Sequence, residues 1–163
     1  MAGHPRFAIG PSQTYTYEFQ VNNRAGTYCF HPHPHGLTGG QVMVGLAGLF
    51  IVSDDEEAAL SLPDGELDVL LVIQDRTFDA DNRLVYLGQA LTADGAAQAP
   101  SGGGMGMMGG GMMNAMMGFL GDRVLVNGRP DFVFSAATRA YRLRLLNGSN
   151  SRIYSWAGAR PSR

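Results

Sequence analysis

The sequence predicts an all-β fold. Several short segments favour strands, turn-forming Gly, Pro and Asn residues separate them, and almost no stretch has the apolar repeat of an amphipathic helix. Such a pattern is typical of a β-sandwich or a β-barrel. The 163 residues suffice for one ordinary domain or two partial ones, and no internal repeat stands out.

The clearest strand pattern covers residues 14–21, where apolar and polar side chains alternate. Tyr15, Tyr17 and Phe19 fall on one face of an extended chain, so a half-buried strand is predicted there. Alternating or continuously apolar runs predict further strands, in chain order, over residues 26–30, 46–52, 67–73, 83–87, 124–126, 132–134 and 141–146.

One or two helical turns are predicted over residues 54–60, because Ser53 and Glu56 match a capping box and Pro63 follows. A domain boundary is expected between about Asp54 and Glu66. It divides the chain into residues 1–60 and residues 61–163.

The composition favours a globular protein and excludes several functions. Hydrophobic residues make up 45% and charged residues 16%, so a core can form. The net charge is −2 without a basic block, which argues against a nucleic-acid partner. The longest apolar stretch, residues 42–52, is too short to span a bilayer. Residues 1–7 show no secretion signal, and the single Cys29 forms no internal disulfide.

The most informative segment, residues 31–36, reads His-Pro-His-Pro-His-Gly and holds three of the four histidines. Residues i and i+2 of an extended chain project to the same side. Each proline pushes the residue before it toward an extended conformation. The side chains of His31 and His33 are therefore expected to point the same way on a stiff backbone.

The spacing of this pair indicates what it could bind. Same-face Cα atoms on a strand lie roughly 6.5–7 Å apart, which is wide for one ion but suits two neighbouring ions. Imidazole suits copper, zinc, iron and nickel, so the histidines alone do not choose the metal. An exposed, proline-stiffened turn with incidental histidines remains the alternative.

The sequence around this segment resembles the bacterial multicopper oxidases, the family of laccases and cuprous oxidases. Residues 26–36 read GTYCFHPHPHG and residues 45–52 read GLAGLFIV. In that family a GTYWYHxHxHG segment closes the first cupredoxin domain and leads into a GLAGxxIV strand. Similar matches to strands of the second domain occur at residues 70–76, 121–128 and 141–150, so the resemblance covers about residues 4–154.

The resemblance implies a cupredoxin-like Greek-key β-sandwich or barrel, present as two partial domains. Residues 1–60 would be the C-terminal part of domain 1 and residues 61–163 the N-terminal part of domain 2. His31 and His33 match the pair that binds the type 3 coppers of the trinuclear cluster. His35 is interpreted as a neighbour that shapes the pocket, with a ligand role left open.

For the whole enzyme, the resemblance implies a copper cofactor and two reaction partners. A phenolic or metal-ion reductant such as Cu(I) gives electrons to a type 1 copper, and dioxygen is reduced to water at the cluster. A periplasmic or secreted location is also implied by the family.

The chain departs from the family pattern in ways that bear on activity. It lacks the HWHG-like element and the last-domain HxxHxH and HCHxxxH motifs. Cys29 is not the type 1 cysteine, because it stands where the family usually has Trp, two residues before His31. The match is lost after Tyr154, so the chain resembles a fragment without the electron-entry site. Other chains or a third domain would have to complete the cluster.

A Gly- and Met-rich loop is predicted over residues 101–118. Thioethers select Cu(I), and a Met-rich segment handles Cu(I) in the cuprous oxidases that this chain resembles. The candidate Cu(I) contacts are Met105, Met107, Met108, Met112, Met113, Met116 and Met117. The alternative is a flexible apolar loop, because Gly and Met both tolerate irregular packing.

Other polar residues give weaker signals. Cys29 shares a face with His31 and could offer a thiolate, although a small buried side chain is the simpler interpretation. Asp75 and Asp79 could relay protons or contact a substrate, but their spacing requires neither. Three hypotheses remain: a member or fragment of the oxidase class, a non-catalytic copper-binding module, and an inactive truncated chain without a stable copper site.

Overall fold

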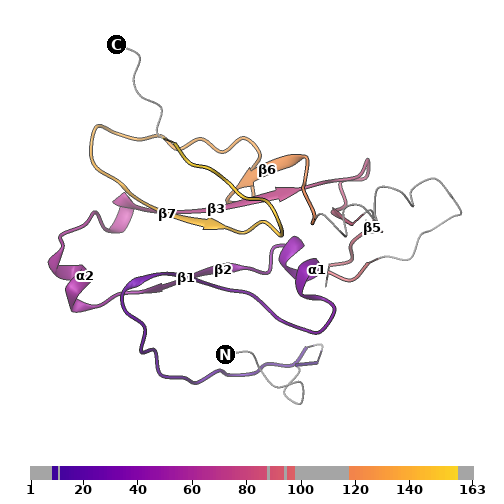
Figure 1. Cartoon of the computed structure of the whole chain (residues 1–163), viewed down its shortest axis with the longest axis horizontal. Coiled ribbons are helices and arrows are strands. Elements are labelled where there is room, and N and C mark those ends of the chain that lie inside the picture. Colours follow the sequence, from indigo (N-terminus) through magenta and orange to yellow (C-terminus); the bar gives the residue numbers. More distant parts are fainter. Residues whose placement is uncertain (1–8, 11, 88, 94, 98–117, 158–163) are drawn as a thin grey trace, which may run out of the picture.

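A computed structural model describes residues 9–10, 12–87, 89–93, 95–97 and 118–157. Two β-sheets dominate it and lie one above the other (Figure 1). One sheet pairs β1 (Gly26–Phe30) with β2 (Gly48–Val52), and the other contains β3 (Asp68–Arg76), β6 (Arg123–Val126) and β7 (Arg142–Asn147). The predicted all-β class is therefore confirmed.

The register of the β1–β2 sheet decides which side chains face the second sheet. The two strands are antiparallel, with Tyr28 opposite Phe50 and Cys29 opposite Leu49. Because side chains alternate along a strand, Thr27 and Cys29 share one face. That face is turned toward β7, since Arg144 Nη1 donates to Thr27 Oγ1 at 3.0 Å. His31 follows β1 directly and continues this face.

The second sheet has the strand order β6-β3-β7. β3 runs antiparallel to β6 and parallel to β7. A parallel pair needs a long crossover connection, and here the chain between β3 and β7 includes β6 and the short hairpin of β4 (Val85–Tyr86) and β5 (Gln89–Ala90). Of the strand predicted over residues 83–87, the structure has only the two-residue strand β4, which pairs with β5 in this hairpin.

Short helices connect the strands. α2 (Asp55–Ala59) confirms the predicted helical turns, with Asp54 as the N-cap that accepts from Glu57 N at 2.8 Å. The capping interaction lies one residue later than the predicted box. A 3-10 turn (Gly65–Leu67) leads into β3.

The helix α1 (Thr38–Met43) was not predicted and packs at the end of both sheets. It contributes the fully buried Met43, which packs with Leu91 and Phe119 in the main apolar cluster. Gly40 permits this position, because a Cβ there would lie only 2.0 Å from Gly95 O. None of the helices in the described residues is long and apolar enough to cross a membrane.

Two predicted strands are wrong. Residues 14–21 and residues 132–134 have no strand assignment. Residues 14–21 run as an extended segment beside the β1–β2 sheet, but no backbone hydrogen bond joins them to another described segment. Tyr17 and Phe19 remain 65% and 62% exposed. The alternating pattern is real, but a strand also requires a neighbouring strand that supplies its hydrogen bonds.

Polar contacts hold the two sheets together. Arg144 on β7 is 5% exposed and donates through Nε to both carboxylate oxygens of Asp68, at 2.9 and 2.8 Å, as well as to Thr27. Farther along, Arg76 Nη2 donates to Val42 O at 3.1 Å. Two buried arginines thus fix where α1 and the start of β1 lie relative to the second sheet.

Candidate metal centre

The histidine segment lies between β1 and α1, outside regular secondary structure. The ring centroids of His31 and His33 are 6.0 Å apart, and the ring planes differ by 33°. Both side chains are exposed. The two imidazoles therefore lie close together and reachable from solvent, as the proline-flanked backbone leads one to expect.

The protonation pattern of His31 follows from its backbone contact. Its Nδ1 lies 3.0 Å from Pro32 O. A carbonyl oxygen only accepts hydrogen bonds, so Nδ1 carries the proton and donates, and Nε2 keeps its lone pair. Metal-binding histidines usually donate their second ring N–H to a carbonyl or carboxylate in this way. With Nδ1 engaged by Pro32 O, Nε2 is the ring nitrogen of His31 that is left available for a metal.

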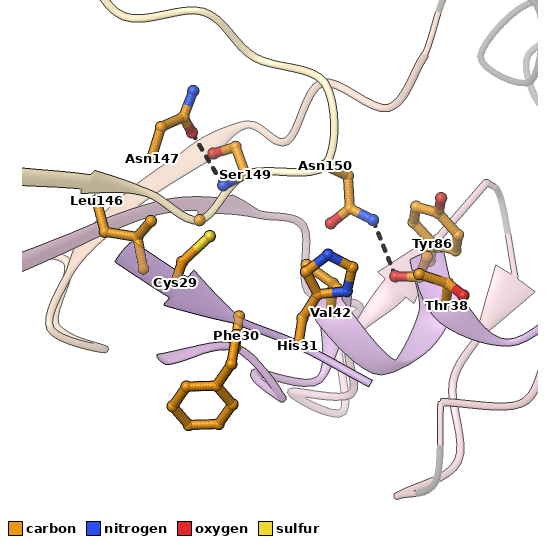
Figure 2. Close-up of a pocket in the computed structure, with 13 residues that line it drawn as sticks. Cys29, Phe30, His31, Thr38, Val42, Tyr86, Leu146, Asn147, Ser149 and Asn150 are labelled. Atoms are coloured by element: carbon orange, nitrogen blue, oxygen red, sulfur yellow. Dashed lines mark hydrogen bonds between the residues drawn. The ribbon is translucent and has the colours of Figure 1, made fainter. Parts of the chain in front are cut away.

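His31 lies at the edge of a hollow of about 420 Å³ between the two sheets, which we call the His31 hollow (Figure 2). The lining on the side of the first sheet includes Cys29 of β1 and His31, which follows β1. The helix α1 contributes Thr38 and Val42, and the loop after β7 contributes Asn150 among others. No charged side chain lines it among the described residues. A single imidazole, that of His31, therefore borders a space between the sheets that is lined by uncharged side chains.

Asn150 is the site residue that the sequence did not reveal. Its Nδ2 donates to Gly39 O at 2.8 Å, and its Oδ1 is buried without a hydrogen-bond partner in the described part of the chain. Asn150 and His31 both line the His31 hollow, and Figure 2 shows both side chains directed into this space. The only signal in the sequence was an Asn-Gly-Ser-Asn turn directly after a buried strand, which does not say what the turn faces.

An ion pair between Arg152 and the buried carboxylate of Asp75 supports the loop that carries Asn150. Asp75 is fully buried, and its Oδ2 accepts from Gly121 N at 2.6 Å and from Arg152 Nε at 2.8 Å. Its own backbone N–H donates to Ser149 Oγ at 2.9 Å. Burial raises the pKa of Asp75, but hydrogen bonds from Ser149, Arg152 and Gly121 outweigh this, so the pKa is lowered overall. Asp75 is therefore held as a structural anion.

Asp79 also has a structural place. Its carboxylate accepts from Asp81 N and Arg83 N and pairs with the guanidinium of Arg83. These hydrogen bonds, the one from the Arg83 backbone first, lower the pKa of Asp79 against the opposing effect of burial. The contacts close the turn before β4.

The remaining predicted site residues are not brought to the His31 hollow. His35 is exposed in the turn before α1, and His33 is not among the residues that line the hollow. The seven methionines of the Met-rich loop, Met105, Met107, Met108, Met112, Met113, Met116 and Met117, lie outside the described residues.

Within the described ranges, no group of three or more His, Cys, Asp or Glu side chains is arranged to hold a metal ion. This part of the chain offers a pair of imidazoles, not a full coordination set. Neutral imidazoles are nevertheless ligands that suit copper. The buried oxygen of Asn150, which has no partner among the described residues and lies in the lining of the same hollow as His31, also suits a cation. The residues present therefore fit a copper site to which they contribute only some of the ligands.

Two main sheets and an imidazole pair directly after β1 fit the class of cupredoxin-like proteins. A family model described as "Multicopper oxidase" matches residues 1–57. The chain belongs to the multicopper oxidase family, whose cofactor is copper.

Named relatives agree with this assignment. A laccase of Bacillus stratosphericus is 34% identical over 90% of this chain, and the multicopper oxidase mco of Staphylococcus aureus is 34% identical over 92%. The crystal structure of McoA multicopper oxidase from Aquifex aeolicus matches 90% of the chain with a TM-score of 0.66 and 40% identity, which confirms the cupredoxin-like fold. The chain spans 27% of the Bacillus laccase and 28% of McoA.

Proposed function

We propose that this chain is part of a laccase-like multicopper oxidase. Copper-dependent oxidation of a phenol, or of a metal ion such as Cu(I), would be coupled to reduction of dioxygen to water at a trinuclear copper cluster. His31 and His33 would be ligands of the type 3 coppers. The observation that carries the proposal is the paired imidazoles, with Nε2 of His31 left free by the Nδ1 contact to Pro32 O.

The ring separation supports two neighbouring ions. Ring centroids 6.0 Å apart with planes tilted by 33° allow each imidazole to bind its own copper. The exposure of both rings leaves them accessible to further ligands. Copper supplies the redox chemistry when bound. The chain's own part is to hold His31 in one tautomer through Pro32 O, while Pro32 and Pro34 restrict the backbone of the histidine before each of them.

The proposal also divides the chain into parts of two cupredoxin domains. Residues 1–60 would belong to the first cupredoxin domain and residues 61–163 to the second. The type 1 copper and the other ligands of the cluster would come from polypeptide outside the described residues, as a third domain or as other chains. His35 would shape the pocket beside the pair, and the Met-rich loop would handle Cu(I).

A non-catalytic copper-binding module is the second candidate. The observation that favours it is that the described residues hold no group of three or more metal-binding side chains. In that case copper would bind at the imidazole pair without turnover of a reductant.

Copper content and oxygen uptake test the proposal. We expect the purified chain to bind copper and the double variant His31→Ala/His33→Ala to lose most of it. The variant His4→Ala, which removes the one histidine outside residues 31–35, should keep it and is the matched control. Unchanged copper in the double variant would exclude the assigned site. Oxygen uptake with a phenolic dye supports the oxidase. Bound copper without uptake supports the module, and an aggregated chain without copper supports an inactive product.

A further inference from the structure

We propose that Asn150 is a positioning residue for the metal at His31. Its carboxamide oxygen would face the metal-binding side of the imidazole and favour a cation there. The inference rests on the proposed function, because it assumes that His31 binds a metal. Asn150 lies on the loop after β7 of the second sheet, whereas His31 follows β1 of the first sheet. Both sheets would therefore contribute to the metal site.

The orientation of the Asn150 amide is fixed by one contact. Nδ2 lies 2.8 Å from Gly39 O, and a carbonyl oxygen can only accept. The opposite orientation would place two carbonyl oxygens against each other. The amide nitrogen therefore points to α1, and Oδ1 points away from Gly39, on the side where Figure 2 shows the ring of His31.

The oxygen itself lacks a partner. Oδ1 of Asn150 is buried and accepts no hydrogen bond from the described residues. Buried carbonyl oxygens are nearly always satisfied, so an unsatisfied one that lines a candidate site is free to accept from an ordered water or to face a cation. The neighbouring hydroxyl of Thr38 does not serve it, because that hydroxyl donates to Pro34 O at 3.1 Å.

Two acceptors thus meet in the His31 hollow. The lone pair of His31 Nε2 and the oxygen of Asn150 are both electron-rich, and no Lys or Arg side chain lines the hollow among the described residues. Two such groups favour a cation between or beside them. The negative end of the amide dipole would stabilise a metal ion bound to Nε2, in direct contact or through one water.

The substitutions Asn150→Asp and Asn150→Leu separate this role from a structural one. Both remove the amide N–H that holds Gly39 O, so a purely structural Asn150 predicts that both weaken copper binding equally. The proposed role predicts opposite results. Asp adds negative charge and tightens Cu(II) binding, whereas Leu removes the oxygen and weakens binding about 10-fold, as is typical for residues that support metal ligands.

Competition titration with Cu(II) on the full chain gives the affinities, and circular dichroism reports whether each variant folds. If Asn150→Leu does not fold, the Asp variant decides alone: tighter binding supports the inference and weaker binding overturns it. Equal losses in both variants, or no change in either, also overturn it. If His31→Ala/His33→Ala leaves binding unchanged, the proposed function fails instead, whatever the Asn150 variants do.

Discussion

Arg152 Nε donates to the buried Oδ2 of Asp75 at 2.8 Å, and this ion pair ties the loop after β7 to the end of β3. The same loop carries Asn150, which reaches α1. A carboxylate with no exposed surface thus supports the second sheet's contribution to the candidate copper site. It does so without facing the His31 hollow itself.

The substitution Asp75→Asn is expected to lower the free energy of unfolding by about 3 kcal/mol, because it removes the charge that a buried ion pair requires. Chemical denaturation with urea measures this. Asp122→Asn is the matched control, since Asp122 is exposed and forms no ion pair in the described part of the chain. Equal stability of the two variants would contradict a structural role for Asp75.

Acid should destabilise the chain partly through the same residue. The pKa of Asp75 is lowered in the folded chain, so its contribution is fully present above the unfolded value of about 3.9 and is lost as the pH falls through the folded value. Asp54 and Glu57 shift in the same direction, so the comparison with Asp75→Asn is needed to isolate Asp75.

The measurement is the free energy of unfolding of the wild type and of Asp75→Asn between about pH 6 and about pH 3. This range includes the pKa of about 3.9 that Asp has in an unfolded chain. The stability difference between the two proteins should shrink on acidification below about pH 4. A constant difference across this range would show that the charge of Asp75 is not what stabilises the fold.

Hydrogen exchange should separate residues 14–21 from the strands. Their amides make no backbone hydrogen bond to another described segment, so they should exchange orders of magnitude faster than those of β3. β3 is paired on both sides and contains the buried Ile73. Exchange followed by mass spectrometry on the full chain tests this. Protection of residues 14–21 equal to that of β3 would show that they pair with another strand in solution.

This segment also shows where prediction from the sequence stops. Alternating or continuously apolar runs predicted β1, β2, β3, β6 and β7 correctly, and each of these strands finds a partner within the described chain. The same alternation over residues 14–21 predicted only an extended conformation with one apolar face. Whether such a segment becomes a strand depends on a neighbour, which a local pattern cannot supply.

The candidate site likewise contains features that the sequence predicted and features that it did not. Local stereochemistry predicted that the rings of His31 and His33 lie together, because proline restricts the residue before it. Asn150 could not be predicted, since it is brought to the His31 hollow only by the parallel pairing of β3 with β7 and by a contact with α1. The helix α1 was itself unexpected, because two glycines lower its intrinsic helix propensity.

The two glycines of α1 give a last test of how the helix is held. A Cβ on Gly40 would meet the backbone oxygen of Gly95 at 2.0 Å, whereas a Cβ on Gly39 would meet the hydroxyl end of the Tyr86 side chain at 2.5 Å. A side chain can rotate away, but the backbone of a packed loop cannot move cheaply. Gly40→Ala should therefore lower the free energy of unfolding by about 1–3 kcal/mol, and Gly39→Ala by clearly less.

Thermal unfolding of the two variants measures the difference directly. Both substitutions raise helix propensity by the same amount, so propensity cancels in the comparison. The loss at Gly40 should also reduce copper binding, because α1 carries the Gly39 carbonyl that orients Asn150. Equal stability of Gly40→Ala and Gly39→Ala would mean that α1 does not lie against Gly95 in solution, and the support for the His31 hollow would be lost with it.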